Sequence, residues 1–472
     1  SGLLKQIFRT KHIAAKHDSG LKKCLSALDL TLLGVGAIIG TGIFVLTGIA
    51  AANQAGPAVV LSFVISGTAC AFAALAYAEL AATVGGCGSA YGYSYVAFGE
   101  IVAWIIGWIL LLEYSISVAA VANGWSGYFN NALTAVGLGL PDALTKSPEL
   151  GGLINLPAAG IILLLMAMLI KGAKQSAQLN TAMVFIKLLA IIIFVGVAAF
   201  NIHPENWHPF MPYGWFNTLP DGKTVGVLAG ASLVFFAYVG FDAVSTQAGE
   251  AINPKKDMPF AIIASLLICT ILYIAVSLVL TGMINYKDIT GPALKAPVAY
   301  AFEASGQPWA VFLITAAATA GLLSVMLVMM LGQTRVFLGM AKDGLLPKFF
   351  AEVHPTFKTP WKSTILVGAV VSIVAGFTPI SLLGDMTSFG TLFAFTMVCL
   401  AVWILRFRDP NRDRPFKVSG LNIVAPLGIL VNTFLILNLG RTAQIFALAW
   451  LVFGLVVYFL YGRPKSHLNT RE

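Results

Sequence analysis

The chain has 472 residues, of which 58% are apolar and 10% are charged, and its net charge is +9 at pH 7. Roughly a quarter of the residues of a soluble domain are charged, so this composition excludes a soluble globular protein. Residues 30–78 contain no charged side chain, and about 20 apolar residues are enough to cross the hydrocarbon core of a bilayer. The sequence therefore predicts an all-α polytopic membrane protein.

Taken in chain order, the predicted elements begin with a basic, mildly amphipathic segment, residues 1–27, that we expect at the cytoplasmic surface. Apolar stretches then predict about twelve transmembrane helices: 29–53, 57–83, 99–131, 153–171, 176–201, 225–249, 259–284, 308–341, 361–377, 380–405, 418–440 and 442–462. A basic cytoplasmic loop, 406–417, precedes the last two helices (418–462), and 463–472 is expected to be a cytoplasmic tail.

The positive charges predict the orientation of these spans. With the N-terminus in the cytoplasm, the inner segments hold 22 of the 29 Lys and Arg residues and the outer loops hold 5. Such an excess on one side follows the positive-inside rule, and it predicts that both termini lie in the cytoplasm. We expect the membrane to be the plasma membrane. The basic segments then face anionic lipid, so the net charge does not call for nucleic acid as a partner.

The cysteines and histidines predict neither a cofactor nor a metal. The five cysteines are scattered and include no CxxC pair, which argues against a disulfide framework and a metal site. None of the six histidines falls in a predicted span, so a histidine proton relay through the membrane is excluded. The spans also lack a Ser/His or HExxH constellation, and we therefore expect no enzyme.

Two of the predicted spans carry residues that interrupt a helix. The first contains GAIIGTGIF, residues 36–44, and the sixth contains FFAYVGFDAVST, residues 235–246. The two spans lie five positions apart in the order of spans, and because five is odd, the two segments cross the membrane in opposite directions. A pair of interrupted helices in corresponding halves is the best sequence indication of the central site of a transporter.

Interrupted helices provide a site made of main-chain groups. In a bilayer, unpaired N–H and C=O groups survive only beside protein or a watery cavity. Amides near Thr41, Gly42 and Ile43, at the start of a half-helix, favour an anion. Carbonyls near Ile38 and in the sixth span favour a cation. A ligand with a carboxylate and an ammonium on one carbon, an L-amino acid, satisfies both.

Four motifs give the chain a specific resemblance to a known family. GAIIGTGIF, YAEL, EAINPKKDMP (250–259) and GQTRVFLGMAKDGLLP (332–347) resemble the amino acid–polyamine–organocation superfamily, and the last two motifs most resemble its cationic amino acid transporter branch. The resemblance implies a five-plus-five inverted-repeat (LeuT-like) fold, with repeats at 28–201 and 202–405, discontinuous helices 1 and 6, and two extra C-terminal helices.

The resemblance also implies which residues hold the substrate. The residues expected to bind the amino acid backbone are Ile38, Thr41, Gly42, Ile43, Phe236, Ala237 and Val239. The aromatic ring of Phe236 is expected to close over the bound substrate as a lid.

Lys187 is the candidate for proton coupling. It lies about eleven residues into the fifth span, ~16 Å deep at 1.5 Å per residue, and burial favours the uncharged form of an amine. The resemblance places it against the first span, where related carriers bind sodium. The alternative is a permanent cation that ties the first, fifth and eighth spans together. We favour proton coupling, because a charge inside the membrane is costly.

The buried carboxylates leave more alternatives open. Glu113, in the middle of the third span, could contact the substrate side chain or tie neighbouring helices. Asp242 could titrate near an inner gate, but we prefer it as an N-cap of the second half-helix. Glu79, Glu250 and Arg335 lie near the inner ends of spans and are expected to form gate or scaffold ion pairs.

These inferences predict proton-coupled symport of L-amino acids by alternating access. An amino acid exchanger with the same fold is the first alternative. A membrane sensor that binds an amino acid without moving it is an alternative of another class. The expected partners are the substrate and membrane lipid, while an accessory subunit is compatible with the sequence but has no signature in it.

Overall fold

The computed structural model describes residues 2–13, 20–40, 42–222, 224–290, 293, 297–307, 309–378, 380–437 and 441–470. Thr41, one of the expected binding residues, lies outside them. Within the described residues the protein is predominantly helical. A short antiparallel hairpin of β1 (Asn217–Thr218) and β2 (Thr224–Val225) pairs Asn217 with Val225.

The α-helices follow the apolar stretches of the sequence. The helices before residue 200 are α1 (Gly2–Ile7), α2 (Ala27–Ile38), α3 (Thr47–Ala50), α4 (Val59–Thr83), α5 (Ala90–Ala97), α6 (Glu100–Ala135), α7 (Leu156–Lys171) and α8 (Ala173–Ala199). Those after it are α9 (Val227–Val234), α10 (Pro254–Met283), α12 (Pro297–Ala304), α13 (Trp309–Lys342), α14 (Trp361–Phe377), α15 (Ile380–Arg408), α16 (Leu421–Leu437), α17 (Arg441–Val457) and α18 (Arg463–Lys465).

Among the described residues, eight helical segments are long and apolar enough to cross a membrane. They are 47–83, 100–130, 173–199, 227–250, 254–283, 309–342, 389–408 and 444–469. The shorter apolar helices α2, α7, α14 and α16 fall on the remaining predicted spans. The chain is thus a multi-pass membrane protein, while the count of twelve spans and the five-plus-five repeat stay predictions.

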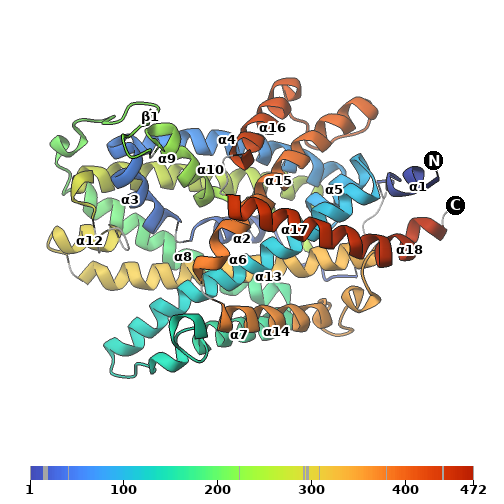
Figure 1. Ribbon diagram of the computed structural model, residues 1–472, viewed down its shortest axis with the longest axis horizontal. Helices are drawn as coiled ribbons and strands as arrows, with labels where there is room; N and C mark the ends of the chain where they lie inside the picture. Colours follow the sequence, from blue (N-terminus) through green and yellow to red (C-terminus); the bar gives the residue numbers. More distant parts are fainter. Residues whose placement is uncertain are drawn as a thin grey trace.

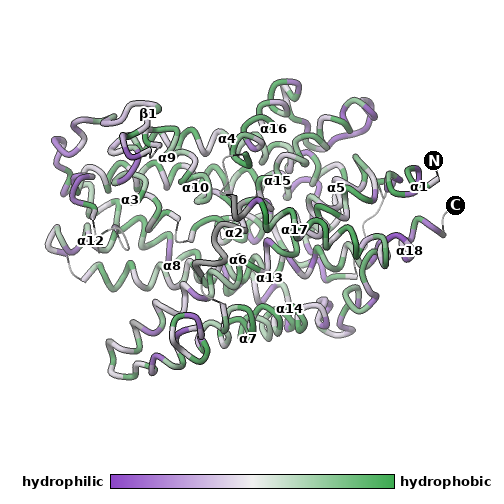
Figure 2. The backbone as a smooth tube through the Cα atoms, viewed as in Figure 1, coloured by the Kyte–Doolittle hydropathy of each residue, from purple (hydrophilic) through white to green (hydrophobic). Residues whose placement is uncertain are grey.

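The long helices lie side by side along the longest axis of the molecule (Figure 1). Helix α10 packs on α4 and α2, α13 packs on α6 and α8, and α15 packs on α16 and α6. Both ends of the chain lie at one end of the bundle, and the hairpin and α12 lie at the other (Figure 1). Figure 2 shows hydrophobic residues along the helices and hydrophilic residues gathered in the loops at the two ends.

The start of α2 is fixed by a local capping arrangement. The Ser26 hydroxyl accepts a hydrogen bond from the Asp29 amide at 3.3 Å, and the Asp29 carboxylate accepts one from the Ser26 amide at 3.1 Å. This reciprocal pair satisfies two amides that the first turn of a helix leaves free. Lys174, at the start of α8, donates to the same Asp29 carboxylate at 2.6 Å, so the beginnings of α2 and α8 are joined.

Candidate functional site

The first interruption follows α2 immediately. The α-helix ends at Ile38, and Ile39 has extended backbone angles (φ −78°, ψ 105°). A π-helix, Gly42–Leu46, then begins and leads into α3. The amides at the start of any helix have no partner within it, and here these are the N–H groups of Gly42 and Ile43.

The second interruption separates α9 from a long 3₁₀ segment. A 3₁₀ turn, Phe235–Tyr238, follows α9; Val239 is extended and Gly240 has φ +135°. A 3₁₀-helix of ten residues, Phe241–Glu250, comes next. Runs of 3₁₀-helix longer than three or four residues are uncommon and often mark a hinge, so the backbone of this segment is irregular over much of its length.

The two interruptions pack directly against each other. A Cβ atom on Gly42 would lie 2.8 Å from the Cβ of Ala237, and a Cβ on Gly240 would lie 2.5 Å from the main-chain oxygen of Ala37. A side chain larger than hydrogen does not fit at such distances, and the φ of Gly240 also disfavours one. The glycines therefore bring two stretches of irregular main chain together in one place.

The Phe236 ring differs from its neighbours in exposure. Its exposed fraction is 36%, whereas those of Phe235, Ala237 and Tyr238 are 1%, 2% and 0%. The expected binding residues Ile38 and Ile43 are buried, and Val239 is half-buried. Phe236 thus presents an accessible aromatic ring beside the interruption. Its role as a lid over the substrate stays a prediction.

Lys187 belongs to α8, and its side chain reaches the C-terminal end of α2. The side chain is fully buried, and its ammonium donates hydrogen bonds to the main-chain oxygens of Gly36 (3.2 Å) and Ile39 (2.6 Å) and to the Ser324 hydroxyl (2.6 Å). Three acceptors match the three donors of an ammonium group. Lys187 therefore connects α8, α2 and α13, and it binds carbonyls that the interruption leaves without helical partners.

Sequence reasoning did not single out Tyr273 of α10. Its hydroxyl lies 2.5 Å from the main-chain oxygen of Ala237 and 3.2 Å from that of Ile38. The hydroxyl, which has a single proton to donate, therefore lies within hydrogen-bond distance of one carbonyl from each interruption. The only signal in the sequence is a tyrosine in the middle of an apolar span, which does not show where its hydroxyl points.

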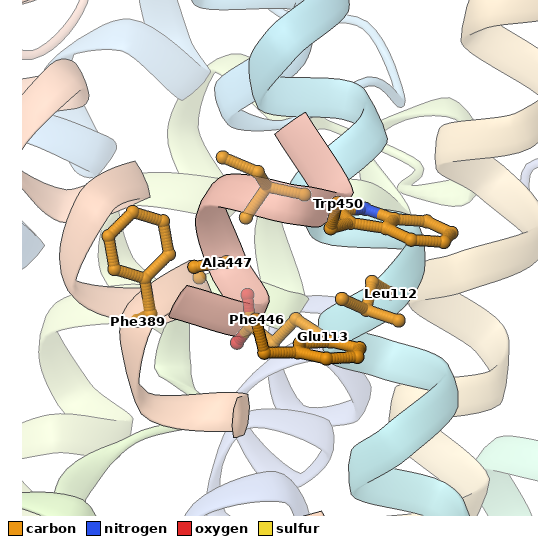
Figure 3. Close-up of a pocket in the computed structure, with 8 residues that line it drawn as sticks. Leu112, Glu113, Phe389, Phe446, Ala447 and Trp450 are labelled. Atoms are coloured by element: carbon orange, nitrogen blue, oxygen red, sulfur yellow. The ribbon is translucent and has the colours of Figure 1, made fainter. Parts of the chain in front are cut away.

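Glu113 lies against α15 and α17, and its carboxylate interacts electrostatically with that of Asp242 in the second interrupted segment. Its Oε1 accepts a hydrogen bond from the Thr391 hydroxyl, and its Oε2 is buried without a partner among the described residues. Figure 3 shows the carboxylate pointing from α6 toward α17, beside Phe389, Phe446 and Trp450. The cavity there is about 10 Å³, enough for a single water molecule. Glu113 thus ties α6 to α15, and a contact with substrate stays a prediction.

Asp242 lies in the first turn of the second 3₁₀-helix. The N-cap position of that helix is Gly240, two residues earlier than the expected cap. The Asp242 carboxylate still interacts with the amides of Gly240 and Ala243, while its Oδ1 has no hydrogen-bond partner among the described residues. The side chain is 2% exposed, so it is a buried acid next to freed amides.

The remaining acidic candidates form ion pairs. Arg335 of α13 binds Glu250 through two hydrogen bonds of 2.6 and 2.8 Å, and both side chains are buried. Glu79 of α4 accepts a hydrogen bond from Arg406, lies 3.7 Å from Arg414 and also accepts one from the Val418 amide at 2.9 Å. These contacts join α4, α13 and α15 to neighbouring segments.

Comparison with known proteins identifies the family. A family profile described as amino acid permease matches residues 25–469. The chain belongs to the amino acid permease family. This permease is therefore a transporter rather than an enzyme, and its family fits a membrane protein that handles amino acids.

Two of the relatives of this permease cover nearly its whole length. It is 45% identical to the branched-chain amino acid permease BcaP of Bacillus subtilis, over 98% of this chain and 99% of the relative. It is 43% identical to the methylthioribose transporter of the same organism, over 99% and 100% of the two chains. It is 38% identical to the vacuolar cationic amino acid transporter 4 of Arabidopsis thaliana, over 83% and 64%. The resemblance to this superfamily and its cationic amino acid transporter branch is confirmed.

Proposed function

We propose that this permease carries L-amino acids across the plasma membrane by alternating access, together with protons moving in the same direction. The observation that carries the proposal is the position of Lys187. Its ammonium binds the carbonyls of Gly36 and Ile39 at the end of the first interrupted helix. A group that can bind and release a proton is thus bonded to the element that would have to move during transport.

The interruptions supply the proposed receptor for the substrate. The amides of Gly42 and Ile43 stand at the start of a helical segment, where the helix dipole favours a carboxylate. Main-chain oxygens of the second interruption, near Phe236 and Val239, are proposed to accept hydrogen bonds from the α-ammonium group. The exposed ring of Phe236 is proposed to cover the substrate.

The proton step follows from the hydrogen bonds of Lys187. A protonated amine donates to all three of its acceptors, whereas a neutral amine has two N–H groups and a lone pair. Loss of the proton therefore removes one donor from the group formed by Gly36, Ile39 and Ser324. The end of α2 is then held less firmly, and α2 is free to change its orientation.

Branched-chain amino acids are the first substrates to test. The relative that is 45% identical to this permease and a Lactococcus lactis relative that is 36% identical over 95% of this chain are both described as branched-chain amino acid permeases. Other relatives are described as transporters of cationic amino acids or methylthioribose, so arginine and lysine belong in the same screen.

The proposed orientation places both termini in the cytoplasm. It is supported by the excess of Lys and Arg in the segments on that side and by the position of both chain ends at one end of the bundle (Figure 1). The proposed location in the plasma membrane, the proton as coupling ion and the absence of any other cofactor belong to the same hypothesis.

Uptake into proteoliposomes tests the proposal. Purified permease is reconstituted, and accumulation of radiolabelled leucine is measured with and without an inward proton gradient. Accumulation that depends on the gradient is the expected result. Exchange of internal for external amino acid without any response to the gradient would favour an exchanger. Saturable binding without accumulation would favour a sensor.

A further inference from the structure

A groove of about 750 Å³ lies along the first turns of α10. We call it the α10 groove and define it by Lys255, Lys256, Phe260, Ile263, Leu267 and Phe416. Ala27, the first residue of α2, and Pro415 complete its walls. The groove is separate from the two interruptions, and it touches both the start of α2 and the loop that follows α15.

One end of the α10 groove is cationic. Lys255 and Lys256 stand in the first turn of α10, both are exposed, and neither forms an ion pair with a described residue. Asp257 is the acidic side chain among the groove residues. The distribution of Lys and Arg predicts that this end faces the cytoplasm. Two lysines and one aspartate give this end of the groove a net charge of +1, which favours an anion.

The other end of the groove is apolar. Phe260 and Leu267 are 59% and 58% exposed, although both are large hydrophobic residues. Seven residues separate them on α10, a distance of ~10 Å along the helix axis. The apolar wall therefore reaches from the level of the lysines into the hydrocarbon core, whose thickness is about 30 Å. A ligand that fits both ends has an anionic group and a hydrocarbon chain.

We propose that the α10 groove binds one anionic phospholipid. Lys255 and Lys256 receive its phosphate, and one acyl chain lies against Phe260, Ile263 and Leu267. A soluble phosphate would leave the apolar wall unused, and a zwitterionic lipid would leave the two lysines without a matching net charge. Basic pockets between helices at the cytoplasmic surface are a recognised way of binding anionic head groups.

Three variants test the proposal in the full-length protein. Lys255→Ala/Lys256→Ala removes the two cations of the groove. Ala264→Trp places an indole ring in the apolar part of the groove and leaves the charges unchanged. Ala264 lines the groove and is half-buried. Lys171→Ala/Lys348→Ala is the matched control, because it removes the same charge from exposed lysines that do not line the groove.

Binding of phosphatidylglycerol and phosphatidylcholine to each purified protein is measured by native mass spectrometry. Wild type and the matched control should prefer phosphatidylglycerol. A lysine near the membrane surface contributes about a factor of five to binding anionic lipid, so the double lysine variant should lose affinity by about 30-fold. Ala264→Trp should lose affinity as well, although its charges are intact.

The same measurements contradict the proposal if Lys255→Ala/Lys256→Ala still prefers phosphatidylglycerol to phosphatidylcholine. They also contradict it if the matched control loses this preference as much as the double lysine variant does. Displacement of the lipid by glycerol 3-phosphate at the same concentration, with no effect of Ala264→Trp, would show an anion site that does not use the apolar wall. If the double lysine variant fails to fold, Ala264→Trp and the salt dependence of phosphatidylglycerol binding decide the outcome. Retained, salt-independent binding in Ala264→Trp would then overturn the proposal.

Discussion

The ammonium of Lys187 lies 2.6 Å from the main-chain oxygen of Ile39, the first residue after α2. The carbonyl end of a helix carries a partial negative charge, so a buried cation is stabilised there. The same contact gives a donor to a carbonyl that the interruption would otherwise leave unpaired in the membrane. A change in the charge of Lys187 therefore changes the hydrogen bonding and the electrostatic stabilisation of the end of α2.

Replacing Lys187 should separate proton coupling from a purely structural role. Lys187→Ala removes the titratable group, and Lys187→Arg keeps hydrogen-bond donors but holds a permanent charge, because a guanidinium group does not deprotonate in proteins. Both variants should lose uptake driven by a proton gradient and keep counterflow of amino acid. Proteoliposome uptake and counterflow assays measure the two activities. Gradient-driven uptake at the wild-type rate in Lys187→Arg would show that Lys187 acts only as a fixed cation.

Gly42→Ala should weaken substrate binding. The added Cβ would lie 2.8 Å from the Cβ and 2.9 Å from the Cα of Ala237, so the two interruptions would have to separate. Such overpacking costs about 1–3 kcal/mol, which corresponds to about a five- to 150-fold change in affinity. The measurement is the dissociation constant for the transported amino acid.

Gly196→Ala is the matched control for that experiment. Gly196 lies in α8 and a Cβ there would meet nothing within 4 Å, so alanine should leave affinity unchanged and stabilise the helix by about 1 kcal/mol. Equal effects of the two substitutions on affinity would contradict the proposed close contact between the interruptions.

The sequence predicted the positions of the apolar helices because a helix that crosses a membrane needs a long stretch of apolar residues with few charges. Helix α2 ends two residues before Gly40, and Gly240 has a positive φ at the second interruption. Glycines in the sequence therefore predicted the positions of both interruptions. The partners of the side chains could not be read in the same way. Tyr273 and Ser324 reach the interruptions from α10 and α13, and only the packing of distant helices shows this. Glu113 lies beside α17, which no local pattern around it indicates.

Tyr273→Phe should destabilise the region between the interruptions. The hydroxyl donates its one proton to the main-chain oxygen of Ala237, with that of Ile38 also within reach, and its removal leaves a buried acceptor unpaired, at a cost of about 1–3 kcal/mol. We expect a lower melting temperature and a higher KM for the amino acid. Tyr300→Phe is the control, because Tyr300 is 37% exposed. An unchanged melting temperature and KM in Tyr273→Phe would show that other groups satisfy these carbonyls.

The buried pair of Glu250 and Arg335 should be sensitive to loss of one partner. Arg335→Met leaves the Glu250 carboxylate buried without its cation, which costs about 3–5 kcal/mol. The double variant Glu250→Gln/Arg335→Met removes both charges and should recover part of the loss. Arg412→Ala, which removes an exposed pair with Asp409, should cost about 0–1 kcal/mol. Thermal unfolding in detergent measures all three, and a double variant no more stable than Arg335→Met would contradict this view of the pair.

Labelling of Cys24 should report the movement of α2. Cys24 is half-buried, whereas the other four cysteines are buried, so it is the residue expected to react with a maleimide. Burial raises the pKa of its thiol, and the charge of Glu250 raises it further. Because the thiolate is the reactive form, labelling should be slower than that of a free cysteine at pH 7 and should accelerate as the pH rises above 9.

The transported amino acid should change that labelling rate at constant pH. The amides of Cys24 and Leu25 donate to the Glu250 main-chain oxygen, each at 2.9 Å, and these bonds must break if the start of α2 moves away from the second interrupted segment. Substrate that drives this movement should expose the thiol and speed its reaction, measured by mass spectrometry over time. Cys24→Ser identifies labelling at other positions. A Cys24 rate that is independent of substrate across the pH range would argue that α2 stays fixed during transport.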